Sequence, residues 1–267
     1  MSALRGTHRT RAGRVTRALL AAALAVAVAG CAAHVLPAVH SEGDRLRMAD
    51  QAYARRDLLD AIDLYKTYIQ RNAGTAQVDG AICMLGQCYL DTRDWPSAEE
   101  QFERLLKDYP ESDSAGSAAY LLGEALMGQS RPRDFDQQYT QKALDQWDDY
   151  MRRYPDHWRH AQAERRVLEV RSQLAAKLVD TGDLYVKLHQ YQPARMYYQR
   201  VIDQYRETVP SADAELGLAL VDARLGKIAE AIDELKDLEQ RFPGRPVTLR
   251  AQLERTRLEQ LMARAAR

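Results

Sequence analysis

A pattern of small and aromatic residues recurs along the chain and constrains its fold more than any other feature. The fullest copy consists of Leu85, Gly86, Tyr89, Ala98, Phe102 and Pro110. Parts of the same pattern recur around Ala61, Ala143, Ala194 and Ala231, so that neighbouring copies lie 37, 45, 51 and 37 residues apart. Repetition at such a period indicates a solenoid, in which one supersecondary unit is stacked on the next.

Each position of the pattern has a physical role in a pair of antiparallel helices. Gly86 and Ala98 are small enough for two helices to cross closely, and Tyr89 and Phe102 fill the space between them. Pro110 ends the second helix because it has no backbone N–H and clashes with the preceding turn. The pattern resembles the tetratricopeptide repeat (TPR). It predicts an all-α fold, a right-handed α-solenoid of about five TPR helix pairs with a C-terminal capping helix.

The repeat pattern also predicts the boundaries within the chain. Five TPR-like repeats occupy residues 43–245, at about 43–74, 79–111, 116–156, 158–208 and 211–244. The third contains an eight-residue insertion that we interpret as an inter-helix loop, since it is rich in Gly, Ser and Pro. Residues 157–190 contain no Pro and predict one long helix, and residues 246–267 predict a polar capping helix. In the fifth repeat, Asp222 replaces the expected tyrosine.

The N-terminus has the composition of a secretion signal. Five arginines precede a thirteen-residue uncharged run, residues 18–30, and no acidic residue comes before Cys31. The run fits the apolar region of a signal peptide and is shorter than the roughly 20 residues that span a bilayer. We therefore predict a signal peptide over residues 1–30.

Residues 28–31, Val-Ala-Gly-Cys, resemble the bacterial lipobox. The resemblance implies that Cys31 becomes the first residue of the mature chain and carries a diacylglycerol and an N-acyl chain, with residues 31–42 as a tether. Ala32, rather than Asp, implies sorting to the outer membrane. An ordinary secretory signal with a chance cysteine is the alternative interpretation.

The remaining composition argues against several classes of function. The 38 basic residues equal the 38 acidic ones, and removal of the five N-terminal arginines leaves 33 basic residues and a formal charge of −5. A mildly acidic chain lacks the basic surface expected for nucleic-acid binding. On a helix, Cys83 and Cys88 would be separated by about 7.5 Å along the axis. This distance is too long for a disulfide, so we interpret the two cysteines as packed thiols.

No catalytic motif is present in the sequence. It lacks a phosphate-binding glycine loop, a G-x-S-x-G motif and an H-E-x-x-H motif. We interpret His157 and His160 as residues of a first helical turn capped by Asp156, rather than as metal ligands. The sequence therefore predicts no enzyme activity, no metal site and no cofactor other than the lipid on Cys31.

The TPR resemblance implies which positions face the concave surface, namely the fifth, ninth and twelfth of each repeat. In the first three repeats these are Leu46, Cys83 and Tyr120, then Asp50, Gln87 and Glu124, then Tyr53, Leu90 and Met127. Two apolar rows beside a polar row could hold an extended peptide, although the same residues could simply pack against neighbouring repeats. The matching positions of the last two repeats, Val179, Asp183, Val186, Leu216, Leu220 and Ala223, are more apolar and favour a protein domain as partner.

The lipobox, the insertion and the long helix together resemble the BamD family, lipoproteins of the outer-membrane β-barrel assembly machinery. The resemblance is carried best by residues 136–147, 154–155, 171–175 and 182–185. It implies a non-catalytic scaffold on the periplasmic face of the outer membrane. Its N-terminal repeats would bind the C-terminal targeting segments of unfolded barrel proteins, and its C-terminal repeats would dock on periplasmic domains of the insertase. The alternative is another TPR lipoprotein of the envelope, such as a pilus-secretin pilotin or a cell-wall synthesis coordinator.

Overall fold

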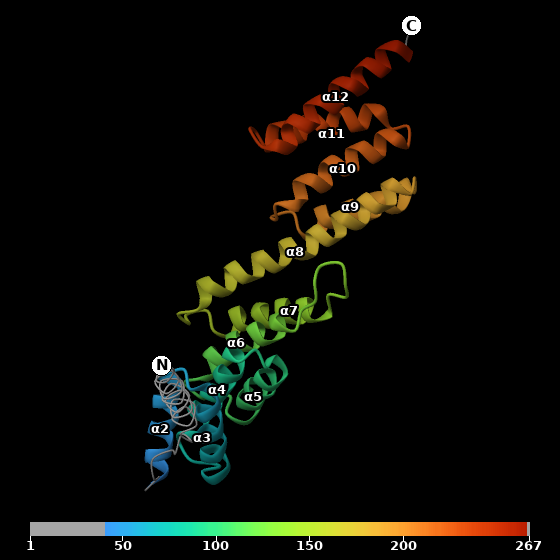
Figure 1. The fold of residues 1–267 in the computed structure, drawn as a ribbon. Helices are drawn as coiled ribbons and strands as arrows, with labels where there is room; N and C mark the ends of the chain where they lie inside the picture. The colour runs from blue at the N-terminus through green and yellow to red at the C-terminus, as the bar shows by residue number, and fades with distance from the viewer. Residues whose placement is uncertain (1–40, 266–267) are drawn as a thin grey trace, which may run out of the picture. The chain divides into compact units, whose positions relative to one another are not determined.

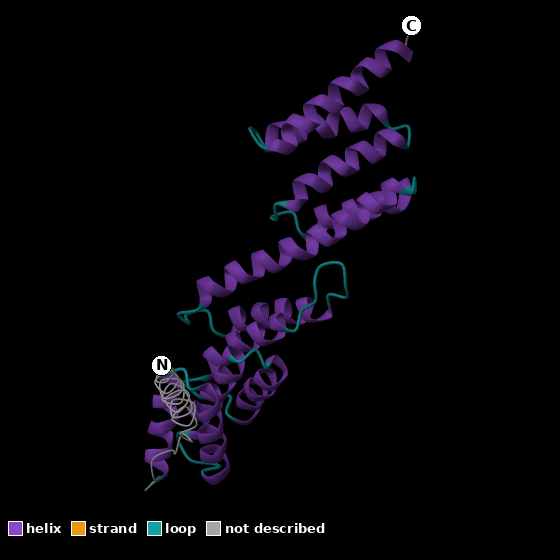
Figure 2. Cartoon of the chain, viewed as in Figure 1, coloured by secondary structure: helices purple, strands orange, loops and turns teal. Residues whose placement is uncertain are grey.

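The computed structural model describes residues 41–265, which, apart from Ser41, belong to one compact unit beginning at Glu42. The predicted signal peptide, the lipidated Cys31 and nearly all of the tether lie outside the described residues. Within the described part, the chain forms helices α2 to α12 and no strand (Figure 2). The predicted all-α fold of stacked helix pairs is confirmed.

The helices follow one another in pairs, and each packs on the next along the chain (Figure 1). The first two pairs are α2 (Glu42–Ala54) with α3 (Leu58–Arg71), and α4 (Val78–Asp91) with α5 (Trp95–Asp108). The third pair is α6 (Ala115–Gly128) with α7 (Gln138–Arg153). The fourth and fifth are α8 (His160–Lys187) with α9 (Tyr191–Gln204), and α10 (Pro210–Arg224) with α11 (Ile228–Arg241). Helix α12 (Pro246–Ala265) packs on both α10 and α11.

The contact between the small and aromatic positions of the repeat is confirmed. The Phe102 ring is fully buried against Gly86, where an added Cβ atom would lie 2.6 Å from the ring carbon Cε1. The Trp147 ring packs on Gly123 in the same way, and the repeat alanines, including Ala98, have no exposed surface. Close helix crossing therefore depends on a missing side chain in one helix and a large ring in its partner.

The fifth repeat carries a buried charge at one of its pattern positions. Asp222 is 1% exposed, and its carboxylate accepts a hydrogen bond from Arg195 Nε at 2.9 Å. Lys227 Nζ lies 3.8 Å from the same carboxylate oxygen, Oδ1. An ion pair between α9 and α10 thus stands where the repeat pattern places a tyrosine.

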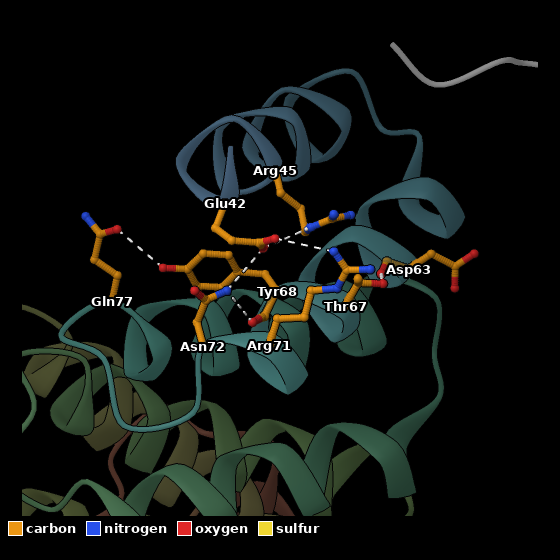
Figure 3. A network of polar contacts seen from close by, with 8 residues as sticks. All are labelled: Glu42, Arg45, Asp63, Thr67, Tyr68, Arg71, Asn72 and Gln77. Atoms are coloured by element: carbon orange, nitrogen blue, oxygen red, sulfur yellow. Dashed lines mark hydrogen bonds and ion pairs between the residues drawn. The ribbon is translucent and has the colours of Figure 1, made fainter. Parts of the chain in front are cut away.

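A polar network fixes the beginning of α2 (Figure 3). The Glu42 carboxylate accepts hydrogen bonds from Arg45 Nε at 3.1 Å, Asn72 Nδ2 at 3.2 Å and Arg71 Nη1 at 3.5 Å. Asn72 also donates to the Tyr68 carbonyl at 2.8 Å. Because Glu42 lies in the first turn of α2, its charge also complements the helix dipole. The start of α2 is thereby joined to the end of α3.

Candidate functional site

A pocket of about 320 Å³ lies where α4, α5 and α6 meet. It is lined by Leu90, Trp95, Glu124, Met127 and Gly128. Three of these residues, Leu90, Glu124 and Met127, are among the positions predicted from the repeat pattern. The structure therefore brings part of the predicted groove together, with an apolar majority and one carboxylate.

Sequence reasoning missed Trp95 and Gly128. Trp95 begins α5 directly after Asp94, whose side chain caps the helix by accepting from Ser97 N. Its indole ring covers Gly128 at the end of α6, and a Cβ atom at Gly128 would overlap the ring. The two residues belong to different repeats, so a pattern within one repeat gives no signal for their contact.

The polar side of this pocket is already engaged in hydrogen bonds. The Glu124 carboxylate accepts from Arg166 Nε at 2.8 Å and Nη2 at 3.0 Å, and from the Tyr120 hydroxyl at 2.7 Å. Burial, with a further contribution from Glu124, raises the pKa of Tyr120 to about 12, and the hydrogen bonds to Glu124 raise the pKa of Arg166. The bidentate Arg166–Glu124 pair also links α8 to α6, because arginine matches a carboxylate with two parallel N–H groups.

The other predicted groove residues lie outside this pocket. Cys83 and Tyr120 are buried, at 7% and 5% exposure, and Asp50 accepts a hydrogen bond from the Tyr65 hydroxyl at 2.6 Å. The remaining members are partly buried, namely Leu46, Tyr53 and Gln87. Within the first three repeats the structure thus gathers a compact pocket instead of two continuous rows.

Both described cysteines are free and buried. Burial raises the pKa of the Cys83 thiol to about 11 and that of Cys88 to about 12. These thiols stay protonated at neutral pH, and a protonated thiol is a poor nucleophile. Among the described residues, no group of three or more His, Cys, Asp or Glu side chains is placed to hold a metal ion.

A larger hollow, of about 790 Å³, lies between α8, α10 and α12. All six positions predicted for the last two repeats line it: Val179, Asp183, Val186, Leu216, Leu220 and Ala223. Helix α12 adds Leu258 and Leu261, so it forms a wall of the groove in addition to ending the array. Arginines on α10 and α12, including Arg224 and Arg257, make up part of its charged rim.

The interpretation of His157 as a residue of the first helical turn is wrong. Helix α8 begins at His160, with Arg159 at its N-cap position, and His157 lies in the preceding turn. The His157 ring is held there by a hydrogen bond of 2.7 Å between its Nδ1 atom and the Tyr150 hydroxyl, and by edge-to-face contact with the Tyr150 ring. Burial, with a smaller contribution from Arg159, lowers the pKa of His157.

These features define a helical-repeat protein of the tetratricopeptide type with two hollows on its helix pairs. The chain belongs to the YfiO family, described as "Outer membrane lipoprotein", whose profile matches residues 40–224. It is 25% identical over 237 residues to the outer membrane protein assembly factor BamD of Caulobacter vibrioides, which covers 87% of this chain and 78% of that protein. No helix of residues 41–265 combines the length and apolar character that crossing a membrane requires.

Solved structures of other repeat proteins are also similar to the chain. A TPR repeats protein of Bacteroides fragilis has a TM-score of 0.49 at 11% identity, covering 84% of this chain and all (100%) of that chain. The TPR2AB domain of yeast Sti1, solved as a complex with pHSP90, has a TM-score of 0.42 at 13% identity, covering 80% of this chain and 83% of that chain.

Proposed function

We propose that the chain is a scaffold lipoprotein of the outer-membrane β-barrel assembly machinery. Lipid on Cys31 would hold it at the periplasmic face of the outer membrane. The N-terminal repeats would bind C-terminal segments of unfolded barrel proteins, and the C-terminal repeats would dock on periplasmic domains of the insertase. Membership of the outer membrane lipoprotein family and similarity to a protein named as an assembly factor support this role.

The pocket between α4, α5 and α6 supports the peptide-binding half of the proposal. Strands of outer-membrane barrels alternate apolar and polar residues. An extended segment of such a strand would place one apolar side chain between Leu90, Trp95 and Met127, while its polar neighbours face solvent. A small apolar pocket beside a hydrogen-bonded carboxylate suits this kind of ligand.

The observation that carries the docking half is the groove of about 790 Å³ between α8, α10 and α12. Its floor contains aliphatic side chains such as Val186, Leu216 and Leu220, and its rim contains arginines and acidic residues. A desolvated apolar centre within a polar rim is the usual anatomy of a protein–protein interface. The groove therefore suits a folded partner domain better than a small substrate.

Crosslinking in intact outer membranes tests the docking half. A photoreactive amino acid at Leu220, inside the groove, is expected to capture the barrel insertase, identified by mass spectrometry. The same group at Asp237, an exposed residue of α11 that does not line the groove, is the matched control and should capture far less. Capture of a pilus secretin or a cell-wall synthase from Leu220 would contradict the proposal and support the alternative envelope function.

Fractionation tests the lipid anchor. A Cys31→Ser variant is expected to lose metabolic labelling with palmitate and to appear in the soluble periplasmic fraction, because the sulfur that would carry the diacylglycerol is missing. The wild-type chain should be labelled and found with the outer membrane. Equal labelling of the two proteins would refute lipidation at this cysteine.

A further inference from the structure

Arg159 has an unusual environment at the start of α8. Its guanidinium carbon lies 4.1 Å from the centre of the Trp158 ring and 5.1 Å from the centre of the Tyr120 ring. Its Nε atom is buried and has no hydrogen-bond partner among the described residues. Its Nη1 atom makes one long contact, 3.4 Å, with Gln162 Oε1.

Other arginines in similar surroundings have a carboxylate partner. The partly buried arginines of the described chain, apart from Arg159, are each paired with Asp or Glu: Arg45, Arg166, Arg171, Arg195 and Arg255. No carboxylate of residues 41–265 forms an ion pair with Arg159. The acidic residue of α6, Glu124, is already bound by Arg166.

This arrangement leaves a partly desolvated positive charge for which the described part of the chain supplies no anion. Removing an ion from water is costly unless a counter-ion and hydrogen bonds replace the lost hydration. The two aromatic faces attract the cation but accept no conventional hydrogen bond. Because the Arg159 side chain is only partly buried, the exposed side of its guanidinium is therefore available to a carboxylate supplied from outside the described chain.

The position of Arg159 relative to the pocket indicates the kind of ligand. Tyr120, below Arg159, and Met127, in the pocket, both belong to α6 and lie seven residues apart. Seven helical residues rise about 10 Å, which is the length of about three residues of an extended chain. One extended peptide can therefore reach both places.

We propose that Arg159 binds the free C-terminal carboxylate of an extended peptide whose apolar side chain, about three residues upstream, enters the pocket formed by Leu90, Trp95 and Met127. This inference rests on the peptide-binding half of the proposed function. The Trp158 ring, 68% exposed beside Arg159, supplies an apolar surface for the side chain of the last residue.

Binding of the terminal carboxylate also fixes the register of the peptide, that is, which of its residues lies in the pocket. A segment with alternating apolar and polar residues can slide by two positions and still present the same face. A carboxylate that occurs once, at the end of the chain, permits a single register. Arg159 thereby makes the site bind the C-terminal segment of a protein more tightly than an internal segment of the same composition.

The test compares two forms of one peptide on the full-length lipoprotein in mild detergent. The probe is the last twelve residues of an outer-membrane barrel protein, labelled at its N-terminus with fluorescein and made as the free acid and as the C-terminal amide. We expect the wild-type protein to bind the free acid at least about tenfold more tightly than the amide, as measured by fluorescence anisotropy. The amide cannot form the hydrogen-bonded charge pair with Arg159, and the loss of such a pair costs about this much affinity.

Variants of Arg159 assign this preference to one side chain. Arg159→Met should bind both peptides with the wild-type affinity for the amide, and Arg159→Lys should retain part of the preference, since it keeps the charge and loses the planar fork. Arg165→Met, at an exposed position of the same helix, is the matched control and should behave as the wild type. The melting temperature of Arg159→Met should not fall, because an unpaired charge is removed.

The possible outcomes separate the two proposals. Equal binding of acid and amide by the wild type, or an unchanged preference in Arg159→Met, overturns the carboxylate site and leaves peptide binding intact. Failure of the wild type to bind either form overturns both the carboxylate site and the peptide-binding half of the proposed function.

Discussion

Two glycines of α4 provide a direct test of how the helix pairs are held together. An alanine Cβ at position 86 would lie 2.6 and 2.7 Å from two carbons of the Phe102 ring, whereas one at position 80 would meet nothing within 4 Å. Carbon atoms normally rest about 3.5–4.0 Å apart, so Gly86→Ala forces a displacement of about 1 Å. The Phe102 ring is fully buried, so it cannot turn into solvent to relieve the overlap.

The expected change in the free energy of unfolding follows from a comparison of Gly86→Ala with Gly80→Ala. Both gain the higher helix propensity of alanine, up to about 1 kcal/mol in a helix interior. Only Gly86→Ala is also destabilised by overpacking, by about 1–3 kcal/mol. We therefore expect Gly80→Ala to be as stable as the wild type or more stable. Gly86→Ala should be less stable than Gly80→Ala by about 1–3 kcal/mol, or about 2–4 °C of melting temperature per kcal/mol.

Urea unfolding followed by far-UV circular dichroism measures this difference. A shift in midpoint with an unchanged slope would show that the stability, rather than the unfolded state, has changed. Phe102→Leu, which removes ring atoms near position 86, should reduce the gap between the two alanine variants. If Gly86→Ala is as stable as Gly80→Ala, the close approach of α4 and α5 is not what fixes the pair, and the reasoning fails.

Three further variants test other parts of the molecule. Asp222→Ala should cost about 1.5–3 kcal/mol in urea unfolding, because it removes a charge-assisted hydrogen bond from Arg195, whose side chain is 36% exposed and can be hydrated instead. Because burial lowers the pKa of His157 in the folded state, the unfolded chain binds its proton first. Stability should therefore fall as the pH drops below about 6.5, and His157→Gln should lose less between pH 7.5 and 5.5. Leu90→Ala combined with Met127→Ala should weaken binding of the barrel-protein peptide about tenfold by fluorescence anisotropy.

Each of these substitutions has a control elsewhere in the chain. Asp213→Ala removes an exposed partner of Arg250 and should change stability by less than about 1 kcal/mol; an equal loss would show that burial of Asp222 does not matter. A His157→Gln protein with the same pH dependence as the wild type would exclude this histidine as the titrating group. Leu59→Ala, at a side chain that is 76% exposed and far from the pocket residues in sequence, should leave peptide affinity unchanged.

The helix pairs could be predicted from sequence because the forces that form them are local. Gly86 and Phe102 lie sixteen residues apart, within one repeat, and the spacing of small and large residues along two consecutive helices determines where they cross. The same reasoning identified six of the residues that line the α8–α10–α12 groove, since equivalent positions of successive helices face the same side.

The departures from prediction all involve contacts between repeats. Trp95 and Gly128 pack together although they lie in different helix pairs. His157 stays out of α8 because its ring bonds to Tyr150 of the preceding helix, which outweighs the local tendency of Asp156 to begin a helix there. Such contacts depend on how each helix pair is rotated on the next, and no spacing within one repeat encodes that rotation.

The amino-acid sequence alone therefore determined the class of fold, since each helix pair depends on residues close together in the chain. The secretion signal, its lipobox cysteine and the inward-facing positions remain predictions from the same kind of local pattern. The tertiary structure decided which inward positions form a pocket and which are buried. It also showed that Arg166 has a carboxylate partner and that Arg159 has none among residues 41–265. Charge pairing is a property of distances across the fold, and Arg159 and Tyr120, 39 positions apart, meet only when the third and fourth repeats are packed together.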